Sequence, residues 1–239
     1  MITVARRSEA KTGELPPLEN GDHLDQKTFH ERYEAMPSHI RAELIGGIVY
    51  MSSPQKAPHG EHWVLFSRWM DEYLEATPGT RGFLNSSNIL GPVSEPQPDG
   101  CLFIRPECGG QTWEDEDKYL NGAPEWIGEL SDSTESIDLH RKKKDYEKAG
   151  VREYMVVALQ SSKVFWFTHG RGKFKEMRPD PDGILRSEVF PGLWLDPAAF
   201  LQHDRQQLLA VLRQGLASPE HAAFVTKLAA KQRSTKSRG

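Results

Sequence analysis

Two carboxylates in this sequence have the type and the setting of a metal site for phosphodiester hydrolysis. Asp99 follows Pro98 in EPQPDGCLFIRP, and Glu129 lies 30 residues later in APEWIGELSDST. Each carboxylate lies in or beside an apolar run of strand length, so two strands of a mixed sheet could bring them side by side. Mg²⁺ prefers oxygen ligands, often one or two carboxylates with water and phosphate oxygens. We therefore predict a Mg²⁺ site at Asp99 and Glu129; the alternative is that Asp99 caps a turn and Glu129 forms a structural ion pair.

A basic helix follows the second carboxylate and could bring a lysine to it. Asp138, Lys142 and Tyr146 are spaced four residues apart, so they would share one face of this helix. An ammonium group on that face would orient the attacking water and offset charge on the phosphate. The neighbouring cations of the helix are Arg141, Lys143 and Lys144. A run of cations normally faces water, and the alternative is that these three contact DNA phosphates.

Two further residues are candidates for the same site. Glu43 lies in the first predicted strand and could act as a third acid, although a lone strand glutamate is more often a surface residue. His59 begins a predicted helix and could contact a phosphate, whereas a histidine at a helix start is more often structural. The sequence has no His-Glu-x-x-His pattern, nucleophile elbow, P-loop or dinucleotide glycine fingerprint. A zinc hydrolase is therefore weakly supported, and serine hydrolases and nucleotide-binding enzymes are set aside.

The composition favours a reducing cytoplasm and restricts the way in which nucleic acid could bind. The 239 residues carry a formal net charge of −4, with a pI of about 6.2, so nucleic acid would need local basic patches. Two cysteines, Cys101 and Cys108, are too few for a disulfide framework. No apolar run approaches the roughly 18 residues that a membrane span requires, and the N-terminus lacks the apolar core of a signal peptide.

Apolar periodicity and turn residues predict a mixture of helices and strands. Helices are predicted at residues 25–36, 59–76, 135–149, 197–214 and 219–231. Strands are predicted as a hairpin at 41–51, then near 82–85, 88–91, 99–105, 125–130, 153–159 and 163–168, with further strand material at 173–196. Loops are predicted at 54–58 and, as a long acidic segment, at 106–122. Strand, helix and strand across 125–159 form one βαβ-like unit.

These elements predict three regions. Residues 1–22 are polar and are expected to be a disordered leader. Residues 23–200 form the main domain, of class α/β (α+β). Residues 201–239 form a C-terminal helical extension that ends in a basic, disordered tail.

Several segments resemble a known family when they are taken in order. They are AELIGGIVYMSSPQKAPH, EPQPDG, APEWIGELSDST, the Asp138–Lys142–Tyr146 helix, AGVREYMVVAL and FPGLWLD. Together they resemble the Uma-type restriction endonucleases, a bacterial branch of the PD-(D/E)xK nucleases, over roughly residues 27–200. The resemblance implies a restriction-endonuclease-like mixed central β-sheet flanked by helices, with a Mg²⁺ or Mn²⁺ site.

The resemblance also implies roles for individual residues. Asp99 matches the acid of the PD element, and Glu129 matches the acid of the second element. The superfamily lysine normally lies two residues after that acid, where this sequence has Ser131. Lys142 occupies the place to which the lysine has moved in the Uma-type family, and Glu43 matches an early acid. The residues that could contact substrate are His59, Ser131, Arg141, Lys143 and Lys144.

Three functions remain open from the sequence. The preferred one is a metal-dependent endonuclease that cuts nucleic acid, with DNA as the expected substrate. Asp99 and Glu129 would hold the metal, with the Leu130 carbonyl as an extra ligand, and Lys142 would position water. Cutting two strands is easiest with two symmetric sites, which favours a homodimer. The alternatives are a nuclease-fold module that binds nucleic acid or protein without cutting, and a hydrolase of small phosphoesters covered by the acidic loop 106–122.

Overall fold

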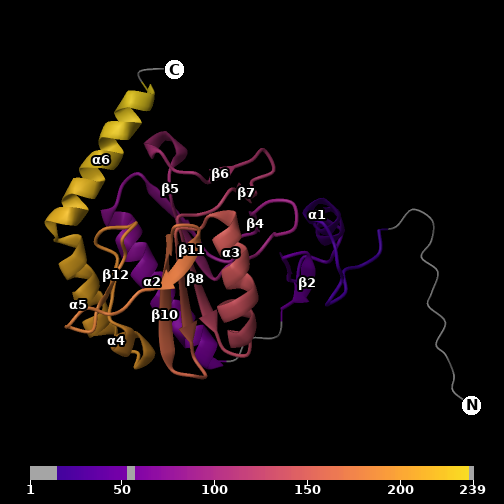
Figure 1. Cartoon of the computed structure of the whole chain (residues 1–239), viewed down its shortest axis with the longest axis horizontal. Coiled ribbons are helices and arrows are strands. Elements are labelled where there is room, and N and C mark those ends of the chain that lie inside the picture. Colours follow the sequence, from indigo (N-terminus) through magenta and orange to yellow (C-terminus); the bar gives the residue numbers. More distant parts are fainter. Residues whose placement is uncertain (1–14, 53–56, 237–239) are drawn as a thin grey trace, which may run out of the picture.

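A six-stranded mixed sheet forms the centre of the protein. The computed structural model describes residues 15–52 and 57–236 of the chain (Figure 1). The strand order is β11-β10-β9-β8-β5-β3, in which only β8 and β9 run parallel among these neighbours. The strands are β3 (Thr80–Phe83), β5 (Gly100–Ile104), β8 (Trp126–Ser131), β9 (Glu153–Ala158), β10 (Lys163–Gly170) and β11 (Lys173–Glu176). The predicted fold class, a mixed central sheet flanked by helices, is confirmed.

A two-part helical segment connects the parallel strands. After β8 the chain enters η2 (Ile137–Lys142), which is a π-helix, and continues as α3 (Lys143–Ala149) before β9 begins. Gly150 ends this helix in the left-handed conformation, with φ of 89°, which glycine adopts without steric cost. The predicted strand–helix–strand unit across residues 125–159 is therefore present, although its helix is wound more loosely at the start than expected.

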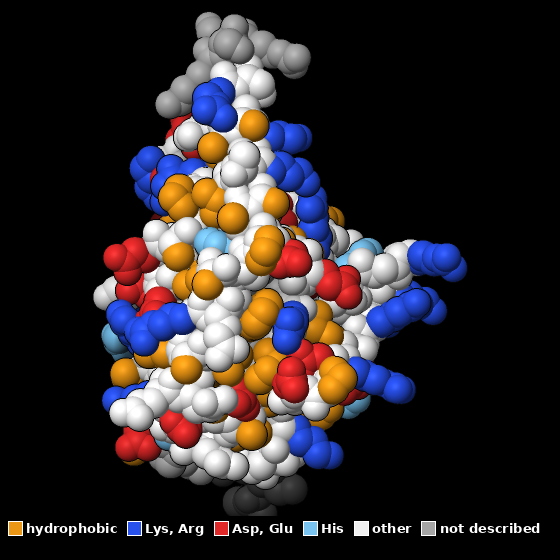
Figure 2. Space-filling view, turned by 90° about the vertical axis from the view of Figure 1, so that its left-hand side faces the viewer, with side chains coloured by type: hydrophobic (Ala, Val, Ile, Leu, Met, Phe, Trp, Pro, Cys, Tyr) orange, Lys and Arg blue, Asp and Glu red, His pale blue; other side chains and the backbone are white. Residues whose placement is uncertain are grey.

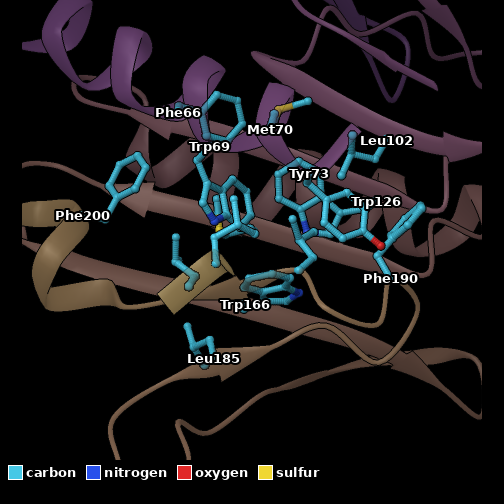
Figure 3. Packing of buried hydrophobic residues seen from close by; sticks show 14 of the residues in the cluster. Phe66, Trp69, Met70, Tyr73, Leu102, Trp126, Trp166, Leu185, Phe190 and Phe200 are labelled. Carbon is cyan, nitrogen blue, oxygen red and sulfur yellow. The ribbon is translucent and has the colours of Figure 1, made fainter. Parts of the chain in front are cut away.

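The helix α2 (Ala57–Ala76) packs against one face of the sheet through a cluster of aromatic side chains (Figure 3). Phe66, Trp69 and Tyr73 are fully buried on it, at the spacing of a single helix face. The Trp69 ring lies 5.8 Å from that of Trp126 on β8, measured between centroids, and 6.3 Å from that of Trp166 on β10. Rings in tilted and edge-on contact at such distances combine large apolar burial with favourable electrostatics.

The opposite face of the sheet packs against α3 (Figure 1). Tyr146 of α3 lies fully buried against Tyr154 and Val156 of β9, with Ile127 of β8 in the same cluster. Side chains alternate between the two faces of a strand. The odd-numbered residues of β8 therefore point toward α3, and the even-numbered ones toward α2.

A separate hairpin lies beside the sheet; it follows the helix α1 (Gln26–Glu34) in the chain and packs against it through Phe29. Strands β1 (Ala42–Ile45) and β2 (Ile48–Met51) pair antiparallel across Gly46 and Gly47, whose φ values are 57° and 81°. Two consecutive positive φ values are the requirement of a tight type I′ hairpin. The predicted hairpin is confirmed. Backbone hydrogen bonds between Leu44 and Glu95 attach it to the segment that leads to Asp99.

The end of the predicted leader is ordered against this hairpin. Residues 1–14 and the loop residues 53–56 lie outside the described residues. Residues 15–22 make backbone hydrogen bonds with β2, and Leu18 is buried with the hairpin core. The prediction of disorder is therefore wrong for residues 15–22, because one apolar side chain and paired backbone groups hold this polar stretch.

The predicted acidic loop at 106–122 contains regular structure. It includes the 3-10 helix η1 (Pro106–Cys108), β6 (Trp113–Glu114) and β7 (Leu120–Asn121). These two strands form a small sheet with β4 (Asn88–Ile89). Two-residue strands carry too little periodicity to be read from a sequence.

The C-terminal third also departs from the prediction in detail. A short β-pair, β12 (Leu185–Arg186) with β13 (Trp194–Leu195), supplies the expected strand material. The single helix predicted at 197–214 is two helices, α4 (Pro197–Leu201) and α5 (Arg205–Leu216), since His203 adopts a positive φ of 57° and Asp204 caps α5. The helix α6 (Pro219–Lys236) extends through residues 231–236, which the sequence predicts to be disordered.

None of the helices in the described ranges is long and apolar enough to cross a membrane.

Candidate functional site

The register of β5 and β8 places the two predicted metal ligands next to each other. Gly100 pairs with Gly128 and Cys101 with Ile127; extending this antiparallel register by one residue puts Asp99 opposite Glu129. The Asp99 backbone N–H donates to Glu129 Oε2 over 3.4 Å, and the Leu130 N–H donates to Asp99 Oδ2 over 2.7 Å. Both carboxylates lie on the α3 side of the sheet, and the structure brings them together.

Two glycines that the sequence analysis overlooked allow this arrangement. A Cβ at Gly100 would lie 2.6 Å from Phe66 Cε1 and from Met70 Sδ. A Cβ at Gly128 would lie 2.4 Å from the Trp126 ring and 2.8 Å from Phe66 Cζ. These approaches are closer than real side chains make. The signal was present in the sequence, because a glycine adjoins each acid inside an apolar run, and strand glycines often mark a close approach.

Lys142 reaches the carboxylates from η2. Its Nζ lies 3.0 Å from Glu43 Oε2, 3.1 Å from Glu129 Oε1 and 3.6 Å from Asp138 Oδ1. Tyr146, one turn later, donates its hydroxyl hydrogen to Glu129 Oε1 over 2.8 Å. The predicted helix face is therefore the face that meets the site. Single π-helical turns in proteins are frequently found at functional sites.

The site holds more negative than positive charge. We call Glu43, Asp99, Glu129 and Asp138 the acid cluster; against these four carboxylates the structure sets one ammonium, that of Lys142. Burial raises the pKa of Asp99, although the Leu130 N–H and Lys142 oppose this change. Burial also raises the pKa of Glu129 well above its ordinary value, against the opposing charge of Lys142 and with the help of Asp138 and Asp99.

The same environment keeps Lys142 protonated. Burial alone would lower the pKa of its ammonium, but the neighbouring Glu129, Glu43 and Asp138 raise it well above the ordinary value. These carboxylates therefore favour the charged form of Lys142. A charged ammonium at this position can orient and stabilise negatively charged groups.

Asp138 also belongs to the site. The four-residue spacing placed it on the helix face of Lys142 but did not predict a role for it. Its Oδ2 accepts hydrogen bonds from Ser131 Oγ and Thr134 Oγ1, each over 2.6 Å. Ser131 is fully buried by this contact. The Ser131 hydroxyl faces Asp138, inside the protein, where it supports the acid cluster, and Ser131 is not among the residues that line the cavity described below; its contact with substrate stays a prediction.

His59 lies on the first turn of α2 and reaches the site at β8. Its Nε2 lies 2.9 Å from the Leu130 carbonyl oxygen, and a carbonyl can only accept, so Nε2 carries the hydrogen. Its Nδ1 is buried and has no hydrogen-bond partner among the described residues. His59 thus touches the carbonyl that the sequence analysis named as an extra metal ligand.

The remaining cations of the helix lie outside the acid cluster. Arg141 donates to the Tyr50 hydroxyl over 2.7 Å and thereby connects the helix to β2. The Lys143 ammonium lies 3.6 Å from the centre of the Phe167 ring, and Lys144 is exposed. The structure gives Arg141 and Lys143 contacts within the protein, while their contact with DNA remains a prediction.

The acid cluster opens onto a cavity of about 790 Å³. Glu43, Asp99, Glu129, Asp138, Lys142 and His59 all line it. The rest of its wall is mostly polar and consists of Asn20, Arg41, Tyr50, Met51, Ser52, Asn85, Gln97, Leu130, Asp132, Ser133, Thr134 and Ile137. The cavity thus presents buried charges to a space large enough for a nucleotide-sized group.

The donors fit magnesium better than zinc. Among residues 15–52 and 57–236, no group of three or more His, Cys, Asp or Glu side chains is arranged to hold a metal ion. Zinc sites need three or four protein ligands. Mg²⁺ is commonly bound by one or two carboxylates that leave room for water and phosphate, which Asp99 and Glu129 can provide. Asp99 Oδ1 makes no hydrogen bond within the described chain and is available to a cation.

Comparison with known proteins decides the family. The model of the Uma2 family, described as "putative restriction endonuclease", matches residues 28–198. The chain belongs to the Uma2 family. The resemblance proposed from the sequence is confirmed, and the Uma2 match ends before α5, so α5 and α6 lie outside it.

A solved structure has the same fold. It is a putative nuclease belonging to DUF820 from Anabaena variabilis, which is 14% identical, with a TM-score of 0.53 over 76% of this chain and 97% of that one. At this identity the likeness concerns the fold alone. No curated protein matches the chain.

Proposed function

We propose that this Uma2 protein is a divalent-metal-dependent endonuclease that hydrolyses DNA, with Mg²⁺ or Mn²⁺ as its ion. The observation that carries the proposal is the acid cluster at the wall of the cavity, in which three carboxylates contact the Lys142 ammonium and a fourth, Asp99, lies beside Glu129. Such an excess of buried negative charge is costly without a compensating cation. A divalent ion beside Asp99 and Glu129 would relieve it.

Each residue then has a defined task. Asp99 and Glu129 would hold the ion, which when bound would neutralise the scissile phosphate and stabilise the leaving oxygen. The Lys142 ammonium would orient the attacking water and stabilise charge on the phosphate. Glu43 fixes that ammonium from the hairpin side, and Asp138 fixes it from its own helix. The water oxygen bonds to phosphorus as the phosphorus–oxygen bond of the leaving nucleotide breaks; the attacking water releases one proton to solvent, and the leaving oxygen takes one up.

A hydrolase of small phosphoesters is less well supported. That alternative relied on the acidic segment 106–122 covering the site. Asp99 precedes the first residue of β5, whereas this segment follows its last residue. The segment thus begins at the opposite end of the strand, and none of its residues lines the cavity. A larger polyanion is therefore not shielded from the acid cluster by it.

Plasmid nicking tests the proposal. Purified wild-type protein should convert supercoiled plasmid to the open circle with Mg²⁺ or Mn²⁺ and not with EDTA. The isosteric Asp99→Asn change removes a proposed ligand and should lower the rate by about 100-fold or more. Glu176→Gln, a change of the same charge on the exposed strand β11, should keep the wild-type rate. Absence of nicking by folded wild-type protein would favour the module that binds without cutting.

A further inference from the structure

The C-terminal extension differs in charge from the rest of the chain. Residues 201–239 contain seven Lys and Arg against two Asp and Glu, a formal charge of +5. Residues 1–200 contain 23 against 32, a formal charge of −9. After Glu220 no acidic residue follows, whereas five cations do. We use 'body' for residues 1–200. The acidic body repels polyanions, whereas the basic residues 201–239 attract them.

The structure turns these cations into a defined surface on α6. Lys227, Lys231 and Arg233 are exposed along its middle and C-terminal part. In the space-filling view, Lys and Arg side chains gather on both sides of the projecting end of the molecule (Figure 2). We call α6 with these three cations the basic arm. None of the three takes part in an ion pair within the described chain, so their charge is available to a partner.

The basic arm is fixed to the body and is not a loose tail. Leu228 is buried, with its Cβ close to Gly79. Thr235 donates its hydroxyl hydrogen to the Glu107 carbonyl of η1 over 3.1 Å. A partner held by the arm is therefore held at a set position relative to the sheet.

That position is remote from the acid cluster. The arm packs on η1, which follows the last residue of β5, whereas Asp99 precedes the first. The five residues of β5 separate them by about 17 Å along the strand. The arm therefore cannot touch the phosphate at Asp99, and its contribution would be to affinity and not to the chemical step.

We propose that the basic arm is a binding surface for the phosphate backbone of duplex nucleic acid, independent of base sequence. The inference rests on the proposed function, because the partner is the substrate that the acid cluster would cut. A duplex presents one negative charge per about 1.7 Å of its axis, a regular array along which an extended helix can place several cations. The acidic body alone would repel this substrate, and the arm supplies the attraction that the body lacks.

Binding without metal separates this inference from the cutting activity. Fluorescence anisotropy with a labelled 30-base-pair duplex in EDTA would compare wild-type protein with the triple variant Lys227→Gln, Lys231→Gln and Arg233→Gln. The matched control carries Lys163→Gln, Lys173→Gln and Lys175→Gln, three exposed lysines on β10 and β11. Both variants lose the same charge. Glutamine has nearly the helix propensity of lysine and arginine, so thermal melting should show that α6 remains folded.

The arm variant should bind about tenfold more weakly at low salt, and the control should bind within twofold of wild type. The slope of log affinity against log salt should become shallower by roughly 0.9 for each lost phosphate contact. At saturating plasmid the arm variant should nick at the wild-type rate.

Equal binding by the arm variant and wild type, or equal weakening by both variants, would overturn the inference. A change in self-association without a change in DNA affinity would also overturn it, in favour of a second copy of the chain. Arm-dependent binding without any nicking would contradict the proposed function alone.

Discussion

Lys142 is the residue around which three carboxylates of the acid cluster are arranged. Its ammonium lies within 3.6 Å of oxygens on Glu43, Glu129 and Asp138, which come from a hairpin, a central strand and its own helix. Removing one partner of a buried ion pair leaves charges without compensation. The residue should therefore matter for both stability and chemistry, and the two effects should depend differently on pH.

The change Lys142→Gln should destabilise the metal-free protein by about 3–5 kcal/mol at pH 8 and lower nicking by roughly 100-fold or more. The loss of stability should shrink at pH 5. Burial already raises the pKa of Asp99 and Glu129 in the folded protein. Such groups hold protons that the unfolded chain has released, so their ionisation lowers stability as pH rises through the folded pKa.

Urea unfolding at pH 5 and pH 8 measures this effect, with Lys144→Gln as the control because Lys144 is an exposed neighbour on the same helix. Equal destabilisation at both pH values, or nicking at the wild-type rate, would show that Lys142 is an ordinary structural ion-pair partner.

At the scale of elements, the site depends on how closely α2 lies over β5 and β8. The paired glycines Gly100 and Gly128 leave room for the Phe66 ring directly beneath the two carboxylates that we propose as metal ligands. Any side chain there must displace α2 or the strands, and a displaced strand would move Asp99 or Glu129.

The change Gly128→Ala should lower the free energy of unfolding by about 1–3 kcal/mol, the usual cost of inserting atoms into a packed core. Adding Phe66→Leu should restore part of that loss by making room for the new Cβ. Gly60→Ala is the control, since a Cβ at Gly60 of α2 meets nothing within 4 Å. Denaturant unfolding of the wild type, Gly128→Ala, Phe66→Leu and the double variant measures the coupling; additive effects of the two changes would contradict the packing explanation.

The sequence was sufficient for the elements with strong local signals. The Gly46-Gly47 turn between apolar runs predicts the hairpin, and the four-residue spacing of Asp138, Lys142 and Tyr146 predicts the helix face that meets the site. The sequence was not sufficient for features that are determined by tertiary contacts. The burial of Ser131, the break of the predicted helix at His203 and the two-residue strands within 106–122 depend on partners distant in the chain.

At the scale of the whole molecule, an acidic nuclease-like domain carries the basic helix α6 (Figure 1). This helix packs on η1, which follows the last residue of β5, whereas Asp99 precedes the first. The Uma2 match covers the domain and not α5 or α6. The two regions would divide the work on a polyanion, with the arm providing affinity and the acid cluster providing the reaction. This division holds only if the cluster takes up a divalent cation that converts its negative charge into a phosphate-binding site.

Calorimetric titration of Mn²⁺ into the protein, in the presence of a saturating duplex, measures that uptake most directly. We expect wild-type protein to bind the ion, because Asp99 and Glu129 offer carboxylate oxygens and the duplex supplies phosphate oxygens. The isosteric double variant Asp99→Asn and Glu129→Gln should lose this binding while it still binds the duplex. Equal Mn²⁺ binding by both proteins, or no binding by wild type, would contradict the central claim.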